Sequence, residues 1–362
     1  MNTTITAGAT MGAATSSKHV KRLRVWIVRG LAGLLVLMLT LTASGALYER
    51  IAEQRDRQAF PVPGQLVDVG GYKLHVHCMG QGSPTVILDA AGGSSSPSWG
   101  LVQPELARSS RVCAYDRAGL GWSERGPAPR DLQQQVRELH ALLNGAGIKG
   151  PYVLVGHSYG ARVARVFAKK YPDAVAGMAL IDPGTLDDDP RFPPENRARL
   201  ASDARMVAFA RWLAPFGVVR VLLPPDDHDD RPMQQQAVSH AFSVTPTFFQ
   251  TVADQQRAMP LTYAQEHEVT SLGSMPLIVV SSTTPDDAIR RVWTGINGEL
   301  AALSTNSIHR VVEGATHMGL VYKREHAQVT LDAIRQVVEA VRHGQPLGTR
   351  YHPYVSNSMF AD

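Results

Sequence analysis

Cysteine is almost absent from this sequence, which has only Cys78 and Cys113 among its 362 residues. Two cysteines are too few for a disulfide-rich scaffold or for a zinc site built from cysteine ligands. Long biased tracts and internal repeats are also lacking. With 44% hydrophobic and 19% charged residues, the chain has the composition of a globular protein.

Most of the chain lacks an excess of either charge. The formal net charge is +4, but residues 1–50 alone carry +5, so the remainder sums to −1. The basic excess therefore belongs to the N-terminal segment, and the nearly neutral body offers no basic surface for a phosphate backbone. Nucleic acid is excluded as a partner.

Charge is completely absent between Gly30 and Tyr48, where leucine dominates. These 19 residues, at about 1.5 Å each, nearly span a hydrocarbon core of about 30 Å. Basic residues precede the run, which predicts a cytoplasmic segment 1–29, a single-pass anchor 30–48 and an extracytoplasmic body. The alternative is a signal peptide cleaved near the small residues 43–46, which would release a secreted body.

Strand and helix patterns alternate over residues 65–183, stop, and resume over 273–343. This alternation predicts an α/β fold with a mostly parallel sheet and helices on both faces. Residues 184–272 show helical patterns and no convincing strand, which predicts an inserted helical cap. Residues 49–64 are expected to form a linker, and residues 344–362 an irregular tail. The predicted strands are Gln65–Val69, Tyr72–Cys78, Pro84–Leu88, Arg111–Tyr115, Tyr152–Val155, Met178–Ile181, Leu277–Val280 and Ile308–Val312.

One serine stands between a buried strand and an amphipathic helix, in Gly156-His157-Ser158-Tyr159-Gly160. A sharp strand-to-helix turn raises such a serine out of the sheet, and small neighbours let the backbone bend that tightly. The helix also directs its positive end toward charge that develops near the serine. Ser158 is therefore predicted to be a nucleophile, the alternative being a tight turn with an inert serine.

A nucleophilic serine needs a base within hydrogen-bond reach. Among 13 histidines, His317 is selected because it follows the strand Ile308–Val312 and precedes the last helix. The carboxyl ends of parallel strands share one edge of a sheet, where Ser158 should also lie. His157 is expected to point elsewhere because it alternates with its neighbours along the strand.

The base in turn needs a carboxylate to orient it. Asp182 comes directly after the strand Met178–Ile181, whereas Asp286 and Asp287 follow the next core strand at a greater distance. Asp182 is preferred because it emerges immediately from its strand. Asp286 and Asp287 remain alternatives, and each could instead be a helix cap.

Hydrolysis through a serine also needs donors for an oxyanion. The backbone N–H of Tyr159 is one candidate, because Tyr159 follows the nucleophile. The second is expected from the loop after Pro84–Leu88, at Ala91 or at Gly92.

Three segments, Tyr115–Ser123, Val155–Gly160 and Gly314–His317, resemble the α/β-hydrolase superfamily, and the resemblance covers roughly residues 65–343. It implies an eight-stranded, mostly parallel sheet, a Ser-His-Asp triad and esterase-like hydrolysis without a cofactor. Two features depart from the family pattern. Asp89-Ala90 replaces the usual His-Gly, and the usual Gly-x-x-Asp turn after the seventh strand is absent. Some relatives place the acid after the sixth strand, which matches Asp182.

The strand order of that fold also implies a disulfide between Cys78 and Cys113, the alternative being two free, buried thiols. The sequence thus predicts a serine hydrolase, a carboxylic-ester hydrolase first, that acts on an apolar acyl substrate. Ser158 excludes the dehalogenase and epoxide hydrolase mechanisms, which need an aspartate there. The alternatives are an acyltransferase or amidase, or a non-catalytic membrane-tethered binding protein. The acidic run 226–230 is expected to be a solvated loop rather than a metal site. Aromatic residues of the cap are expected either to line an apolar pocket or to pack the cap onto the core: Phe209, Trp212, Phe216, Phe248 and Phe249.

Overall fold

The computed structural model describes residues 13–183, 190–225, 229–283 and 286–348, and it contains one eight-stranded sheet. The strand order is β1-β2-β4-β3-β5-β6-β7-β8. β1 and β2, and β2 and β4, pair antiparallel, and the remaining neighbours pair parallel. All eight predicted strands are present, with ends that differ by a few residues: β1 (Gln65–Asp68), β2 (Lys73–Met79), β3 (Thr85–Asp89), β4 (Val112–Tyr115), β5 (Tyr152–His157), β6 (Val175–Ile181), β7 (Leu277–Ser281) and β8 (Ser307–Val311).

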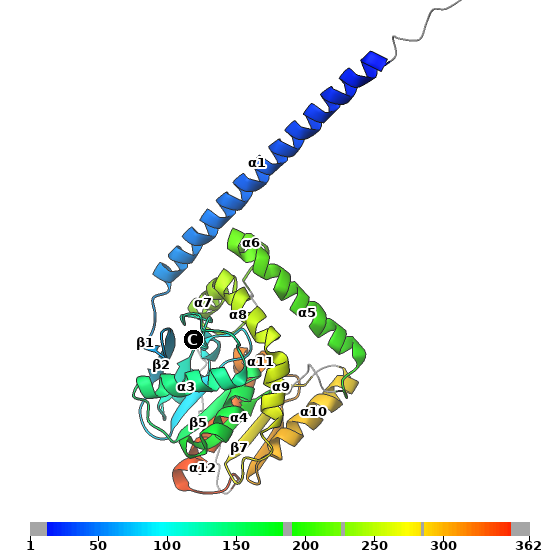
Figure 1. Ribbon diagram of the computed structural model, residues 1–362. Coiled ribbons are helices and arrows are strands. Elements are labelled where there is room, and N and C mark those ends of the chain that lie inside the picture. Colours follow the sequence, from blue (N-terminus) through cyan, green and yellow to red (C-terminus); the bar gives the residue numbers. More distant parts are fainter. Residues whose placement is uncertain (1–12, 184–189, 226–228, 284–285, 349–362) are drawn as a thin grey trace, which may run out of the picture.

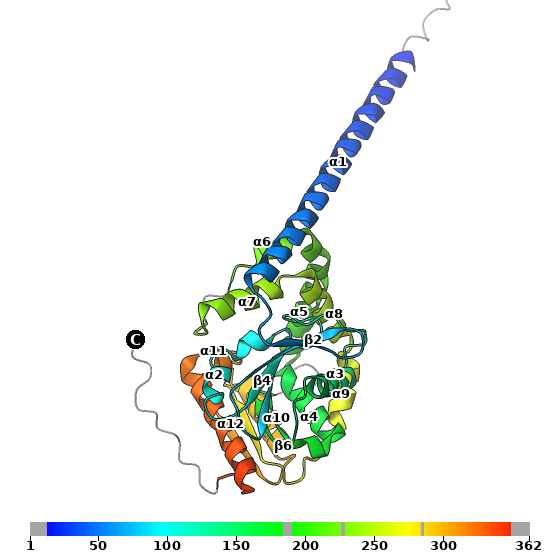
Figure 2. The same ribbon diagram turned by 90° about the vertical axis from the view of Figure 1, so that its left-hand side faces the viewer.

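Helices cover both faces of this sheet, as predicted (Figures 1 and 2). α3 (Leu132–Gly145) and α4 (Tyr159–Lys170) cover one face, and α2 (Gln103–Leu106), α11 (Gly319–Tyr322) and α12 (Arg324–His343) cover the other. α10 (Asp287–Ala301) packs on β7 and β8. Alternate strand residues serve the two cores: Ile87 packs on the first side, and Val86 and Leu88 pack on the second.

The segment between β6 and β7 is helical wherever the structure describes it, as expected for the cap. It contains α5 (Pro194–Leu213), α6 (Val218–Leu222), α7 (Met233–Ser243), α8 (Pro246–Arg257) and α9 (Met259–His267), with the 3₁₀ turn η3 (Ala214–Phe216) between α5 and α6. α5 packs along α8. Two further 3₁₀ turns, η1 (Ser96–Trp99) and η2 (Pro172–Ala174), lie within the first part of the core.

The helix α1 (Ala13–Ala59) is longer than predicted. Most of the linker expected at residues 49–64 is helical, because no glycine or proline interrupts the chain between Gly45 and Pro61. Glu49 and Asp56 on this extension pair with Arg220 of the cap, at 2.9 and 2.7 Å. Among the described helices, the stretch Lys21–Ala59 of α1 is the one long and apolar enough to cross a membrane, and its most apolar part is wholly exposed.

A disulfide joins Cys78 on β2 to Cys113 on β4. The two residues are direct partners in the antiparallel ladder, so their side chains project to the same face of the sheet. The bond ties the antiparallel edge of the sheet, β1 and β2, to the parallel part.

Candidate active site

Ser158 stands at a strained turn between β5 and α4. Its φ is +53°, and Asp182, at +45°, is the only other non-glycine residue with a positive φ among the residues described. The backbone N–H of Ser158 donates to the carbonyl of Ile181 at 2.9 Å, which ties the turn to the end of β6. Strain of this kind costs about 1–3 kcal/mol and persists only where surrounding contacts hold it.

Two glycines make this turn possible. A Cβ at Gly156 would lie 2.4 Å from the backbone nitrogen of Ala161. A Cβ at Gly160 would lie 2.4 Å from the carbonyl oxygen of Asp89, because α4 begins directly against the end of β3. No side chain fits at either position without moving backbone atoms.

Asp182 and His317 are hydrogen-bonded to each other at the carboxyl edge of the sheet. His317 Nδ1 lies 2.7 Å from Asp182 Oδ2. The carboxylate is completely buried and also accepts hydrogen bonds from the Ser282 N–H at 2.9 Å, the Ser282 hydroxyl at 2.5 Å and Trp293 Nε1 at 2.7 Å. Nothing in the sequence pattern singled out Ser282 or Trp293. Ser282 reaches Asp182 because it follows β7, the neighbour of β6, and Trp293 reaches it through the packing of α10 on the sheet.

The pKa of Asp182 lies below its ordinary value. Burial by itself raises this pKa, but the hydrogen bond and charge of His317, together with the hydrogen bonds from Ser282, outweigh it. The carboxylate is therefore ionised at neutral pH and able to stabilise a positive charge on the His317 ring.

His157 links the strand that carries Ser158 to the loop that carries His317. Its Nε2 donates to the carbonyl oxygen of His317 at 3.0 Å, and the two ring centroids are 4.8 Å apart. Burial, with the nearby His317 ring, lowers the pKa of His157 to about 3, so the His157 ring is neutral. Sequence reasoning missed this contact, since it joins residues 160 positions apart.

The other predicted acids lie in different settings. Asp286 is the N-cap of α10, where its exposed carboxylate accepts the N–H groups of Ala288 at 2.9 Å and Ile289 at 3.1 Å. This is the helix-cap alternative that the sequence left open. The side chain of Asp287 lies outside the described part of the structure.

The loop after β3, which carries the predicted oxyanion donors, is held by a buried ion pair. Arg117 forms an ion pair with Asp89, and Asp89 also accepts a hydrogen bond from the Tyr115 hydroxyl at 2.6 Å. Arg117 donates to the carbonyl oxygens of Ala90 at 2.6 Å and Ala91 at 2.5 Å. The departure from the family's His-Gly thus has a structural counterpart, because Asp89 anchors the arginine.

Peptide geometry then sets the direction of the candidate donors. In a trans peptide the N–H points opposite to the preceding C=O. Because the carbonyls of Ala90 and Ala91 face Arg117, the N–H groups of Ala91 and Gly92 face away from it. A Cβ on Gly92 would contact the Cβ of Tyr159 at 3.5 Å, so this loop lies beside the start of α4.

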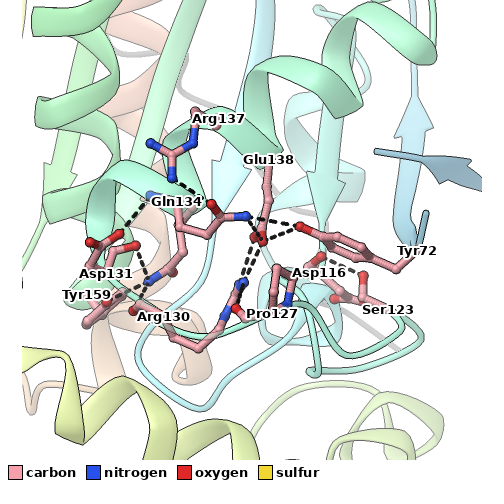
Figure 3. A network of polar contacts seen from close by, with 11 residues as sticks. Tyr72, Asp116, Ser123, Pro127, Arg130, Asp131, Gln134, Arg137, Glu138 and Tyr159 are labelled. Atoms are coloured by element: carbon pink, nitrogen blue, oxygen red, sulfur yellow. Dashed lines mark hydrogen bonds and ion pairs between the residues drawn. The ribbon is translucent and has the colours of Figure 1, made fainter. Parts of the chain in front are cut away.

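A second buried polar network holds Tyr159 from the side of α3 (Figure 3). The Tyr159 hydroxyl accepts a hydrogen bond from Gln135 at 2.7 Å. Glu138, on the same helix as Gln135, forms an ion pair with Arg130 and accepts a hydrogen bond from the Tyr72 hydroxyl at 2.6 Å. Burial and the neighbouring Glu138 carboxylate raise the pKa of Tyr72 to about 12.

No group of residues able to hold a metal ion occurs in the described parts of the chain. Residues 226–228 of the acidic run lie outside them. Asp229 pairs with Arg231, and Asp230 pairs with Lys323 at 3.1 Å, so these two carboxylates neutralise cations of the protein itself.

The cap aromatics lie in three different settings. Phe249 is buried in the cap against Ala214 and Val219. The Phe248 ring would lie 3.4 Å from a Cβ at Gly93, so it covers the end of the loop after β3, which carries the predicted oxyanion donors. Phe209 and Trp212 are instead exposed, at 64% and 67%.

Known proteins share this architecture. A model of the family described as alpha/beta hydrolase fold matches residues 84–216. The uncharacterized protein YqjL of Bacillus subtilis is 28% identical over 244 residues, which are 66% of this chain and 79% of that protein. The structure of the epoxide hydrolase CorEH has a TM-score of 0.56 at 21% identity, covering 77% of this chain and 99% of that one. A thermophilic esterase from Thermogutta terrifontis has a TM-score of 0.54 at 22% identity, covering 76% and 98%.

Proposed function

Because this chain has the α/β-hydrolase fold, we propose that it is a serine hydrolase that cleaves carboxylic esters through Ser158, His317 and Asp182. The observation that carries the proposal is the 2.7 Å hydrogen bond between His317 Nδ1 and the buried Asp182 carboxylate, at the sheet edge where Ser158 occupies its strained turn. An inert turn has no need of a serine at positive φ, which glycine or asparagine adopts at lower cost.

The reaction follows from these positions. Asp182 fixes the His317 ring so that Nε2 is free to accept the Ser158 proton while Oγ attacks the ester carbonyl. The N–H groups of Tyr159 and Ala91 hydrogen-bond the oxyanion that forms. His317 then returns the proton to the departing alcohol, which leaves an acyl group on Ser158. Water, deprotonated by His317, attacks the acyl group and releases the acid.

The residue at the nucleophile position separates this proposal from other chemistries of the fold. One of the structural neighbours is an epoxide hydrolase. Hydrolases that open epoxides or remove halides through an alkyl-enzyme need an aspartate at this turn, and this chain has Ser158. A serine supports acyl transfer, to water or to another acceptor.

We further propose that residues 30–48 of α1 anchor the protein in a membrane, with the N-terminus cytoplasmic and the catalytic body outside. The exposed apolar length of α1 supports an anchor, and the basic residues before it favour this orientation. The Cys78–Cys113 disulfide agrees with an oxidising compartment for the body.

A fluorophosphonate probe tests the catalytic proposal, because it labels activated serines. We expect labelling and ester hydrolysis in the wild type, and neither in Ser158→Ala. Ser109→Ala, at an exposed serine, is the matched control and should retain both. Lack of labelling in well-folded wild-type protein would favour the binding-protein alternative. Labelling without ester turnover, but with turnover of amides or of an alcohol acceptor, would favour an amidase or acyltransferase.

A further inference from the structure

The cap exposes an apolar surface near its junction with α1. Six side chains on α5 and around the end of α6 form this surface, each between 49% and 70% exposed, and we name it the apolar cap face: Met206, Phe209, Trp212, Val221, Leu222 and Leu223. α5 and α6 contact each other directly and through η3. Soluble proteins seldom leave so many large apolar side chains together in water.

Close packing fixes this surface relative to α1. η3 lies against α1, where a Cβ on Gly45 would come within 2.5 Å of the Phe216 carbonyl oxygen. A Cβ on Gly217 would likewise lie 2.5 Å from the ring of Tyr48. Glycines on both sides thus allow the two backbones to approach, and Arg220 adds its ion pairs to Glu49 and Asp56.

The level of this contact along α1 coincides with the end of the apolar run. The run of uncharged residues ends at Tyr48, which is 47% exposed and lies beside Gly217. In Figure 1, α5 runs from this junction across the direction of α1. The contacts of α1 with η3 and Gly217 thus place the start of the cap at the level where the uncharged run ends.

Aromatic residues mark the same level. The Arg211 guanidinium lies 5.0 Å from the centroid of the Trp212 ring. An apolar ring and a cationic group are therefore present together at the surface. Trp and Tyr are enriched at the boundary between hydrocarbon and water. Exposed Trp26 lies just before the proposed anchor 30–48, so aromatic side chains stand at both ends of it.

We infer that the apolar cap face lies in the headgroup region of the same bilayer that α1 crosses, so that the cap docks on lipid. The inference rests on the proposed anchor and adds a second, peripheral attachment to it. Lipid is the occupant that fits, because the face is joined rigidly to the one described helix able to enter a membrane.

Fluorescence quenching in nanodiscs tests the inference on the full-length protein. Both native cysteines are in the disulfide, so a single introduced cysteine can carry an environment-sensitive label. Leu223→Cys reports on the apolar cap face. Leu261→Cys, on α9, is its matched control, since both leucines are 49% exposed. Leu37→Cys reports on α1. Discs contain lipids with or without bromine on the upper acyl chain, and thermal unfolding verifies the fold of each variant.

Bromine should quench the label at Leu223 about twofold or more relative to Leu261, because interfacial groups reach about 5–10 Å into the boundary. Quenching at Leu37, with Leu223 no different from Leu261, would overturn the docking and leave the anchor intact. No quenching at Leu37 would overturn both. A Leu223 label shielded from water yet insensitive to bromine would show a protein contact instead and would also overturn the docking.

Discussion

The replacement Arg117→Met tests what orients the loop after β3, which carries the predicted oxyanion donors Ala91 and Gly92. Methionine keeps an unbranched apolar stem in a fully buried site, while the guanidinium that holds the carbonyls of Ala90 and Ala91 is lost. The Ala91 carbonyl keeps its hydrogen bond from the Ser94 N–H at 3.0 Å, but the Ala90 carbonyl, which sets the direction of the Ala91 N–H, loses the partner that the structure describes for it. Losing one oxyanion donor typically lowers kcat by about 10²–10³, or about 2.7–4 kcal/mol.

The same change affects stability through a separate route. It leaves the buried carboxylate of Asp89 without its cation, which costs about 3–5 kcal/mol when a buried pair is broken. Burial already raises the pKa of Asp89 while Arg117 opposes it, so the pKa of Asp89 rises further in the variant. The double variant Asp89→Asn/Arg117→Met removes the unpaired charge and keeps an acceptor for the Tyr115 hydroxyl. We expect it to recover part of the lost unfolding free energy but none of the kcat.

Steady-state ester hydrolysis and urea unfolding, measured on the same samples, separate these two effects. Arg231→Met is the matched control, because Arg231 forms a similarly buried pair with Asp229 in the cap. It should lose comparable stability and retain kcat. If Arg117→Met is destabilised and yet turns over at the wild-type rate, the arginine does not orient the donors and the reasoning fails.

Three further predictions concern the acid and the disulfide. Asp182→Asn should lower kcat by about 10⁴, because the amide favours the wrong His317 tautomer, whereas the helix-capping Asp286→Asn should leave kcat unchanged in the same assay. The lowered pKa of Asp182 contributes stability that is complete above the unfolded value of about 3.9 and is lost as the pH falls through the folded pKa. Urea unfolding between about pH 5 and pH 2 should therefore be less pH-dependent in Asp182→Asn, and equal slopes would contradict the assignment. Replacing Cys78 and Cys113 together by alanine should lower the unfolding free energy by about 4 kcal/mol for a sequence separation of 35 residues, and an unchanged urea midpoint would refute this.

Local patterns were sufficient to predict the eight strands and the edge of the sheet at which Ser158 and His317 lie. Strands carry their own signal in runs of apolar residues, and parallel topology assigns their carboxyl ends to a common edge. Asp182 and Asp286 could not be separated by pattern alone, since both follow a core strand. What distinguishes them is packing: α10 begins at Asp287 and uses the Asp286 carboxylate as its N-cap, and it brings Trp293 onto Asp182.

Contacts between distant residues had no such local signal. His157 reaches the main chain of His317 because the end of β5 meets the loop after β8 in space, and no local pattern at either residue indicates this contact. Arg117 is different, because a signal was available. Asp89 stands where the family has histidine, and a buried acid at the end of a strand requires a cation, which the segment after β4 supplies. The end of α1 was misjudged because its charged residues resembled a linker, whereas Arg220 gives them a folded partner.

The Cys78–Cys113 bond also limits how far mechanical load can travel through the molecule. Once the contacts of α1 with the cap are broken, tension on α1 passes through Pro61 and Pro63 into β1, an edge strand that pairs with β2 in the described sheet. Such a force can peel β1 away and then begin to strip β2, but the covalent link to β4 stops it at Cys78. The strands that present Ser158, Asp182 and His317 lie beyond this stop, so they remain undisturbed when the outer hairpin yields.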